Sequence, residues 1–323
     1  MRALICGISG QDGAYLARLL LEHGYEVIGT SRDAQVARFD NLRRLGILDR
    51  VTLESMSTVD FRSVFQVLRK WVPNEVYSLA GQSSVGLSFE QPVETFNSIV
   101  NGTVNLLEAI RYLGEPIRFY NAASSESFGN VVGGMADETT PFQPRSPYGT
   151  AKAAATWVVS NYREGYGLFA CNGILFNHES PLRPSRFVTR KVVSAAASIA
   201  KGSKDKLALG NLDVRRDWGW APEYVEAMRR MLQQDKPDDY VVATGTLSTL
   251  EEFVAAAFGE VGLDWREHVV RDPALMRPTD LAGFAGNASR AARQLDWQPS
   301  TTMPEVAVAL VRAEMGDNPR IRR

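Results

Sequence analysis

ALICGISGQDGAYLARLLLEHG, residues 3–24, is the stretch that decides the fold. Residues 3–6 form an apolar run of strand length, and residues 15–23 have the apolar periodicity of an amphipathic helix that Gly24 would end. Between them Gly7, Gly10 and Gly13 form the pattern Gly-x-x-Gly-x-x-Gly. Such glycines let the backbone turn tightly and approach a pyrophosphate, for which the helix N-terminus supplies N–H donors. The stretch predicts a dinucleotide-binding turn; the alternative is a glycine-rich turn with no ligand.

Apolar runs alternate with helical patterns through the first half of the chain. We predict further strands at residues 26–29, 51–53, 75–79, 117–121 and 168–175, and helices at 59–71, 93–113 and 148–166. This order predicts an α/β fold with a Rossmann-type doubly wound parallel sheet. After residue 177 the pattern loosens, and short strands at 206–209 and 240–243 mix with helices and loops. We expect a dinucleotide-binding domain over residues 1–177, to which the chain returns in part later, and a smaller α/β substrate domain over residues 178–323.

Composition limits the classes of partner. The chain has 323 residues, of which 45% are hydrophobic and 23% charged, and its net charge is −1, so no global field favours nucleic acid or an anionic membrane. Cys6 and Cys171 lie in apolar runs, which makes a disulfide improbable and fits a cytoplasmic location. The three histidines show no metal-ligand spacing. The chain opens on a strand-like run, so we expect no signal peptide, and no apolar stretch reaches the roughly 20 residues that span a bilayer.

The end of the second predicted strand bears on the choice of dinucleotide. NAD enzymes usually carry an acid there to bind the adenosine ribose. This chain instead has Ser31 followed by Arg32, and an arginine can pair with the 2′-phosphate of NADP. Asp33 could neutralise Arg32 or bind a ribose hydroxyl itself, and Arg32 could be a solvated surface charge. We therefore predict NADP, and the sequence leaves NAD open.

Candidate catalytic residues follow the fifth predicted strand. Tyr148 and Lys152 are four residues apart and thus share one helix face, so the lysine charge, with an oxidised nicotinamide, would lower the pKa of the phenol. The tyrosinate could then take a proton from a hydroxyl group during hydride transfer. Ser124, at the carboxyl end of the strand, would hydrogen-bond the reacting oxygen. Glu126 adds a carboxylate that suggests a second proton transfer; its structural alternative is a cap for the next turn.

Longer strings resemble one family. GQDGAYL at residues 10–16, RSPY at 145–148, NYRE at 161–164, GILFNHESP at 173–181, FVTRK at 187–191, RRDWG at 215–219 and RPT at 277–279 are similar to strings of the GDP-mannose 4,6-dehydratases, which are extended short-chain dehydrogenases. The resemblance covers nearly the whole chain. Ser124 stands where the family usually has threonine, and it retains the hydroxyl group.

The resemblance implies a reaction in three stages, in which C4 of the sugar is oxidised, water is eliminated across C5 and C6, and the hydride returns to C6. It assigns Ser124, Glu126, Tyr148 and Lys152 to catalysis. It further assigns cofactor contacts to Gly7, Gly10, Gln11, Asp12, Gly13, Arg32, Leu79, Ala80, Tyr148 and Lys152, and substrate contacts to Ser83, Asn177, Lys191, Arg216, Arg277 and Asp280. The cofactor would stay tightly bound, because each turnover regenerates it. For His178 and Glu179 we favour a supporting role in their loop.

Several alternatives stay open at this point. The substrate could be another GDP-sugar such as a GDP-heptose, or the chain could be a nucleotide-sugar 4-epimerase or reductase, neither of which needs the carboxylate of Glu126. A non-catalytic NADP sensor is a third reading, against which the intact Tyr148, Lys152 and Ser124 argue. We expect a homodimer or homotetramer, since the helices at 93–113 and 148–166 usually pair across a dimer in this superfamily.

Overall fold

Seven parallel strands form the central sheet of the computed structural model, which describes residues 1–275 and 283–316. Their order across the sheet is β12-β7-β5-β4-β1-β2-β3. The chain starts in the middle at β1, builds one half through β2 and β3, and crosses over to build the other half, which is the doubly wound topology predicted from the sequence. The strands are β1 (Arg2–Cys6), β2 (Glu26–Ser31), β3 (Thr52–Ser55), β4 (Glu75–Ser78), β5 (Arg118–Ser124), β7 (Ala170–Leu175) and β12 (Asp239–Val242).

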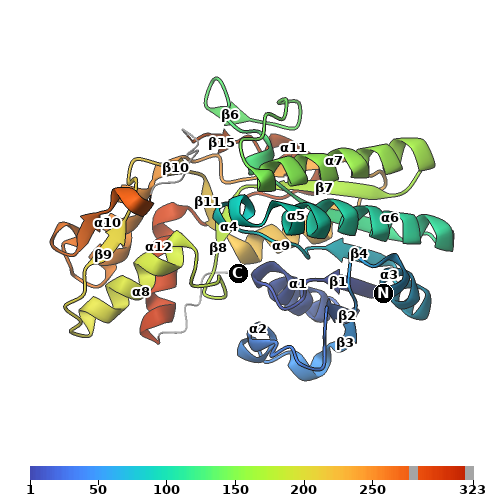
Figure 1. Ribbon diagram of the computed structural model, residues 1–323, viewed down its shortest axis with the longest axis horizontal. Helices are drawn as coiled ribbons and strands as arrows, with labels where there is room; N and C mark the ends of the chain where they lie inside the picture. Colours follow the sequence, from blue (N-terminus) through green and yellow to red (C-terminus); the bar gives the residue numbers. More distant parts are fainter. Residues whose placement is uncertain (276–282, 317–323) are drawn as a thin grey trace.

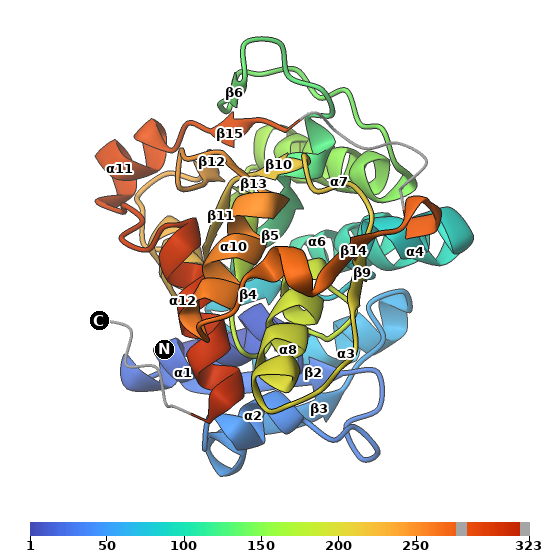
Figure 2. The same cartoon turned by 90° about the vertical axis from the view of Figure 1, so that its left-hand side faces the viewer.

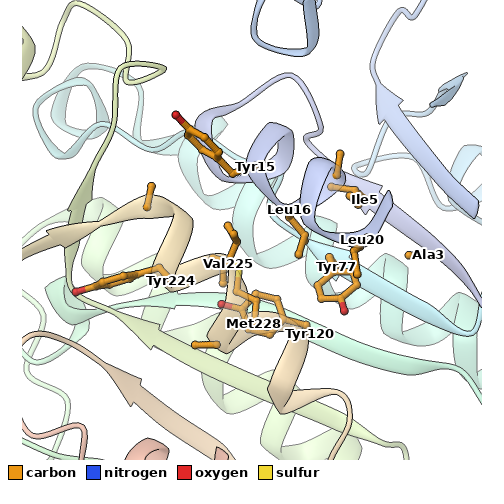
Figure 3. Packing of buried hydrophobic residues seen from close by; sticks show 14 of the residues in the cluster. Ala3, Ile5, Tyr15, Leu16, Leu20, Tyr77, Tyr120, Tyr224, Val225 and Met228 are labelled. Carbon is orange, nitrogen blue, oxygen red and sulfur yellow. The ribbon is translucent and has the colours of Figure 1, made fainter. Parts of the chain in front are cut away.

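Both faces of the sheet are covered by helices, as the continuous apolar runs of its strands require. Ala3 and Ile5 of β1 point to the face that carries α1 (Gln11–Glu22) and α9 (Ala221–Met231). Leu4 and Cys6 point to the opposite face, covered by α3 (Phe61–Trp71), α6 (Gly102–Leu113) and α7 (Pro147–Tyr166). All four side chains are fully buried. Figure 1 shows these helices along the sheet, and Figure 3 shows side chains of α1 and α9 packed together over the strands.

A second core lies beside the sheet. Its helices are α8 (Val188–Ala200), α10 (Leu250–Glu260) and α12 (Met303–Met315), which pack through buried side chains such as Val193, Phe253 and Leu310. Figure 2 faces this group, which is seen at the left of Figure 1. Strand β8 (Asn177–Glu179) follows β7 directly, so the second core adjoins the carboxyl ends of the sheet strands. The division into domains that we predicted remains a prediction, although α9 and β12 do bring later parts of the chain to the sheet.

Short elements complete the described chain. Paired strands are β6 (Met135–Ala136) with β15 (Ala285–Gly286), β8 with β11 (Trp218–Trp220), β9 (Leu207–Leu209) with β14 (Val269–Arg271), and β10 (Arg215–Arg216) with β13 (Ser248–Thr249). Further α-helices are α2 (Asp40–Arg44), α4 (Val85–Glu90), α5 (Pro92–Phe96) and α11 (Ser289–Leu295). Single 3₁₀ turns lie at Leu48–Arg50, Ser125–Ser127, Trp265–Glu267 and Pro273–Leu275.

Two predicted helices differ from the structure. Helix α1 begins at Gln11, four residues before the predicted start, because Gly13 allows close packing and does not break the helix. A Cβ atom on Gly13 would lie 2.4 Å from the carbonyl oxygen of Gly7. The single helix predicted at 93–113 is instead α5, a π-helical turn at Asn97–Asn101, and α6. Strand β5 extends three residues beyond its predicted end, to Ser124.

None of the described helices combines the length and the hydropathy needed to cross a bilayer. Within residues 1–275 and 283–316, no three His, Cys, Asp or Glu side chains are grouped so that they could hold a metal ion. Cys6 and Cys171 are both buried and are not bonded to each other.

Candidate active site

The glycine turn follows β1, where the order in which the chain adds strands to the sheet reverses between β2 on one side and β4 on the other. Gly7 has φ +86°, which a glycine adopts without strain, and a Cβ atom there would lie 2.9 Å from the backbone nitrogen of Ala80. Ala80 follows β4, the strand next to β1, so the turns after these two strands are in contact. Helix α1 begins after Gly10 with no side-chain cap from the described residues. The turn thus offers bare backbone and a helix N-terminus, a shape that fits a pyrophosphate.

Helix α7 brings Tyr148 and Lys152 to the end of β5. Its N-terminus is fixed by Ser146, whose side chain accepts a hydrogen bond from the backbone N–H of Gly149 (3.0 Å), and by Pro147 in the first turn. A Cβ atom on Gly149 would lie 2.6 Å from the carbonyl oxygen of Glu126, so only glycine lets the helix approach this closely. The Tyr-x-x-x-Lys pair is therefore held against the segment that follows β5.

The four predicted catalytic residues are brought together. The Nζ atom of Lys152 donates to the carbonyl oxygen of Ala122 in β5 (2.6 Å) and lies 5.8 Å from the ring centroid of Tyr148. Ser124 ends β5, and its hydroxyl oxygen accepts from the backbone N–H of Glu126 (3.3 Å). The charge of Glu126 acts on the phenol of Tyr148.

Burial has the largest effect on the pKa values of Tyr148 and Lys152. Desolvation raises the pKa of Tyr148 to about 12, against a hydrogen bond with Ser124 that lowers it. Desolvation also lowers the pKa of Lys152 to about 8, and the nearby charge of Asp12 opposes this. Burial therefore disfavours the charged form of both side chains, and the predicted lowering of the Tyr148 pKa by Lys152 together with an oxidised nicotinamide stays a prediction.

A cavity of about 440 Å³ joins the end of the sheet to the second core. The predicted site residues that line it are Asp12, Leu79, Ser83, Ser124, Glu126, Tyr148, Lys152, Asn177, Lys191 and Arg216. Gly7, Gly10, Gln11, Gly13, Arg32 and Ala80 are not among its lining residues. Arg277 and Asp280 lie outside the described residues.

Two cationic residues of this cavity were missed from the sequence. Arg183 pairs with Glu179 (Nε to Oε2, 3.3 Å), and Arg186 donates to the hydroxyl of Ser83 (3.4 Å). A cluster of arginines directly after the GILFNHESP string was the available signal. With Lys152, Lys191 and Arg216 they make five lysine and arginine side chains among the described lining residues, against the acids Asp12, Glu126 and Glu179. This excess of positive charge suits a diphosphate.

Among the residues that the structure describes, Arg32 and Asp33 do not form an ion pair with each other. The Asp33 carboxylate accepts from the backbone N–H groups of Gln35 (2.9 Å) and Val36 (3.3 Å), so it holds its own loop. Arg32 is exposed directly after β2, the strand beside β1 and its glycine turn.

Comparison with solved structures places the fold in a known group. UDP-glucose 4-epimerase of Thermus thermophilus in complex with NAD superposes with a TM-score of 0.86 at 28% identity, covering 98% of this chain and 99% of that one. A dTDP-glucose 4,6-dehydratase of Streptomyces venezuelae superposes with a TM-score of 0.85 at 22% identity, covering 97% and 96%. The fold and the Tyr-x-x-x-Lys site define an extended short-chain dehydrogenase of the nucleotide-sugar type.

Sequence comparison is more specific. Residues 4–309 match the family described as GDP-mannose 4,6 dehydratase. GDP-mannose 4,6 dehydratase 1 of Arabidopsis thaliana is 45% identical over 97% of this chain and 89% of its own length, and the Sinorhizobium fredii GDP-mannose 4,6-dehydratase is 43% identical over 97% and 96%. The chain belongs to the GDP-mannose 4,6-dehydratase family. This confirms the predicted family and, with it, the predicted class of enzyme, a nucleotide-sugar 4,6-dehydratase.

Proposed function

We propose that the chain converts GDP-D-mannose to GDP-4-keto-6-deoxy-D-mannose at the cavity that contains Tyr148, Lys152, Ser124 and Glu126. The observation that carries the proposal is the presence of Glu126 in the same cavity as the other three residues. Oxidation at C4 needs only the tyrosine, lysine and serine, whereas removal of water needs an additional base for the C5 proton.

The first stage is oxidation at C4. A bound nicotinamide dinucleotide supplies the hydride acceptor at C4 and the hydride donor at C6; solved structures of similar fold contain NAD or NADPH. Tyr148 takes the proton of the C4 hydroxyl, and Ser124 holds the same oxygen through its hydroxyl group. Lys152 places its positive charge beside the tyrosinate that takes this proton.

The second stage is elimination across C5 and C6. The C4 ketone acidifies the C5–H bond, Glu126 removes that proton, and the C6–O bond breaks with loss of water. Two protons are removed in a turnover, from the C4 hydroxyl and from C5. Two are returned, one to the departing oxygen and one to C5, so Tyr148 and Glu126 end the cycle in their starting states.

The cationic residues that line the cavity would bind the GDP moiety. Lys191 comes from α8, Arg216 from β10, Asn177 from the start of β8, and Ser83 from the segment before α4. Arg183 and Arg186 add positive charge to the lining of the same cavity. Arginine meets phosphate oxygens bidentately, which fixes the nucleotide while leaving the sugar at the β5 end.

Incubation of purified protein with GDP-mannose tests the proposal. A mass spectrum should show loss of one water from the sugar nucleotide, with no net accumulation of reduced cofactor. Bound but unconverted GDP-mannose would point to another GDP-sugar, with a GDP-heptose to be assayed next. Net consumption of reduced cofactor, or a product of unchanged mass, would instead indicate a reductase or an epimerase.

The cofactor we propose is NADP. Support comes from Arg32, which is exposed after β2 while Asp33 is engaged with its own loop. Arg32→Ala should weaken NADP⁺ binding by roughly tenfold or more, the effect of a lost charged hydrogen bond, and leave NAD⁺ binding unchanged. Titration calorimetry with both dinucleotides measures this. Arg69→Ala, at the far end of α3, is the control, and an equal loss for both dinucleotides would contradict the role of Arg32.

We further propose a homodimer through the face formed by α5, α6 and α7, which lie side by side. Large apolar side chains are exposed on these helices: Val93 is 73% exposed, Tyr112 67% and Trp157 62%. Trp157→Glu should convert the dimer to a monomer in light scattering, because a buried carboxylate opposes association. Val132→Glu alters a fully exposed apolar residue in the loop before β6 and should leave the dimer intact. A dimer that survives Trp157→Glu would place the interface elsewhere.

A further inference from the structure

Asp12 and His178 form a pair that the proposed chemistry does not use. Asp12 lies in the first turn of α1, and His178 lies on β8, 166 residues along the chain. The Nε2 atom of His178 is 2.9 Å from Oδ2 of Asp12, and its Nδ1 atom is 2.7 Å from the carbonyl oxygen of Phe176. His178 is a buried residue, 8% exposed, and its ring stacks on the ring of Tyr224 with 4.6 Å between the centroids.

The partners of the ring identify its charge state. A carbonyl oxygen and a carboxylate are both acceptors, so both ring nitrogens must donate, and only the imidazolium has two N–H groups. Burial disfavours this charged form, but the charge and hydrogen bond of Asp12 outweigh burial and raise the pKa of His178. Burial likewise opposes ionisation of Asp12, yet His178 lowers the pKa of that carboxyl to about 2. The pair is therefore an aspartate bound to a histidinium.

The negative charge of Asp12 lies at the N-terminus of α1, where it affects the binding of an anionic ligand. A carboxylate in the first turn stabilises the helix dipole, but at a helix N-terminus that binds pyrophosphate it also repels the ligand. Asp12 lines the same cavity as Tyr148 and Lys152, which brings its charge to the cofactor end of the site. With His178 protonated, the net charge that the two residues bring to this turn is zero.

Neighbouring groups reinforce the contact. Gln11 donates to Oδ1 of Asp12 (3.0 Å) and to the carbonyl oxygen of His178 (3.1 Å), and it accepts from the hydroxyl of Ser180 (2.7 Å). The start of α1 is thus joined to β8 by side-chain contacts on both sides. Arg183 is the other charged group that acts on both members of the pair, and its positive charge lowers the pKa of each. The charge of Asp12 in turn raises the pKa of three neighbouring groups: Tyr120, Tyr148 and Lys152.

We propose that His178 is a positioning residue which neutralises Asp12 and fixes the phosphate-binding turn against β8, so that the turn can accept the pyrophosphate of the cofactor. The inference rests on the proposed dinucleotide site, but not on the choice between NADP and NAD, since both carry the same pyrophosphate.

A double-mutant cycle tests this role, with NADP⁺ and NAD⁺ binding as the readout. His178→Phe keeps a ring against Tyr224 but removes the charge, so NADP⁺ affinity should fall by roughly tenfold or more from the uncompensated carboxylate. Combining it with Asp12→Asn should recover most of this loss, because the repelling charge is then gone. If the contact were only structural, the double variant would bind at least as weakly as His178→Phe, and that result would overturn the proposal.

Two further variants complete the design. His178→Gln, alone and with Asp12→Asn, repeats the cycle with a neutral donor in place of the histidine should the phenylalanine variant fail to fold. His268→Phe removes another histidine stacked on an aromatic ring, Phe258 (6.0 Å), and should leave affinity unchanged. Unchanged affinity in His178→Phe, with wild-type protein that binds NADP⁺, would refute this inference alone. Wild-type protein that binds neither dinucleotide would refute the proposed cofactor site as well.

Discussion

Replacement of Glu126 by glutamine should stop the reaction after oxidation at C4. Glutamine keeps the size of the side chain but cannot take the C5 proton, so the rate of product formation should fall by about 10²–10⁴-fold, the usual contribution of a general base. Tyr148, Lys152 and Ser124 are unchanged in this variant, so the first oxidation should still occur. In a single turnover, reduced nicotinamide should therefore accumulate to a level that the wild-type protein never reaches.

Two measurements in the same stopped-flow experiment separate the possible outcomes. Absorbance of reduced nicotinamide follows oxidation at C4, and mass spectrometry of quenched samples follows loss of water. Glu164→Gln, on the exposed surface of α7, is the matched control and should behave as wild type. Loss of water at the wild-type rate in Glu126→Gln would show that another group is the base. Loss of both signals would mean that Glu126 supports the geometry of β5 and α7 more than it supports proton transfer.

Local sequence predicted the parts of this site that depend on neighbouring residues. Gly13 is fixed by its contact with Gly7 in the same βα turn, and Tyr148 and Lys152 share a helix face because they are four residues apart. Ser124 and Glu126 could be placed because parallel strands present their carboxyl ends to one crevice. Each of these inferences needs only a short stretch of chain and the regular geometry of its element.

Features that depend on distant residues were outside the reach of the sequence. Nothing in the apolar run near residue 240 shows that β12 pairs with β7, since its partner lies about 70 residues away. The contact of His178 with Asp12 joins the first helix to a strand of the second half of the chain.

Two local features were also not predicted. The start of α1 was misplaced because Gly13 and Asp12 are weak helix formers, while the packing that requires glycine there involves Gly7. The π-helical turn at Asn97–Asn101 has no signature in the apolar periodicity of its helix.

Replacement of Tyr148 by phenylalanine should abolish the oxidation at C4 and, with it, every later stage of the reaction. The ring remains, so the packing of α7 on β5 is retained, but no group is left to take the C4 hydroxyl proton. We expect product formation to fall by about 10²–10⁴-fold, and, in contrast to Glu126→Gln, no reduced nicotinamide should form in a single turnover. Burial raises the pKa of the Tyr148 phenol to about 12, since a buried phenolate is poorly solvated.

The contrast between the two variants is what tests the order of steps. If Tyr148→Phe still reduced the cofactor, the phenol would not be the base for C4, and Lys152, whose pKa is lowered to about 8, would be the next candidate. Tyr166→Phe, which removes an exposed phenol from the last turn of the same helix, is the control and should retain wild-type turnover. Calorimetric titration with GDP should give the same affinity for Tyr148→Phe and wild type, because the proposed contacts to the nucleotide lie at Lys191 and Arg216. Oxidation lost with GDP binding retained would place Tyr148 at the sugar, ahead of Glu126 in the reaction.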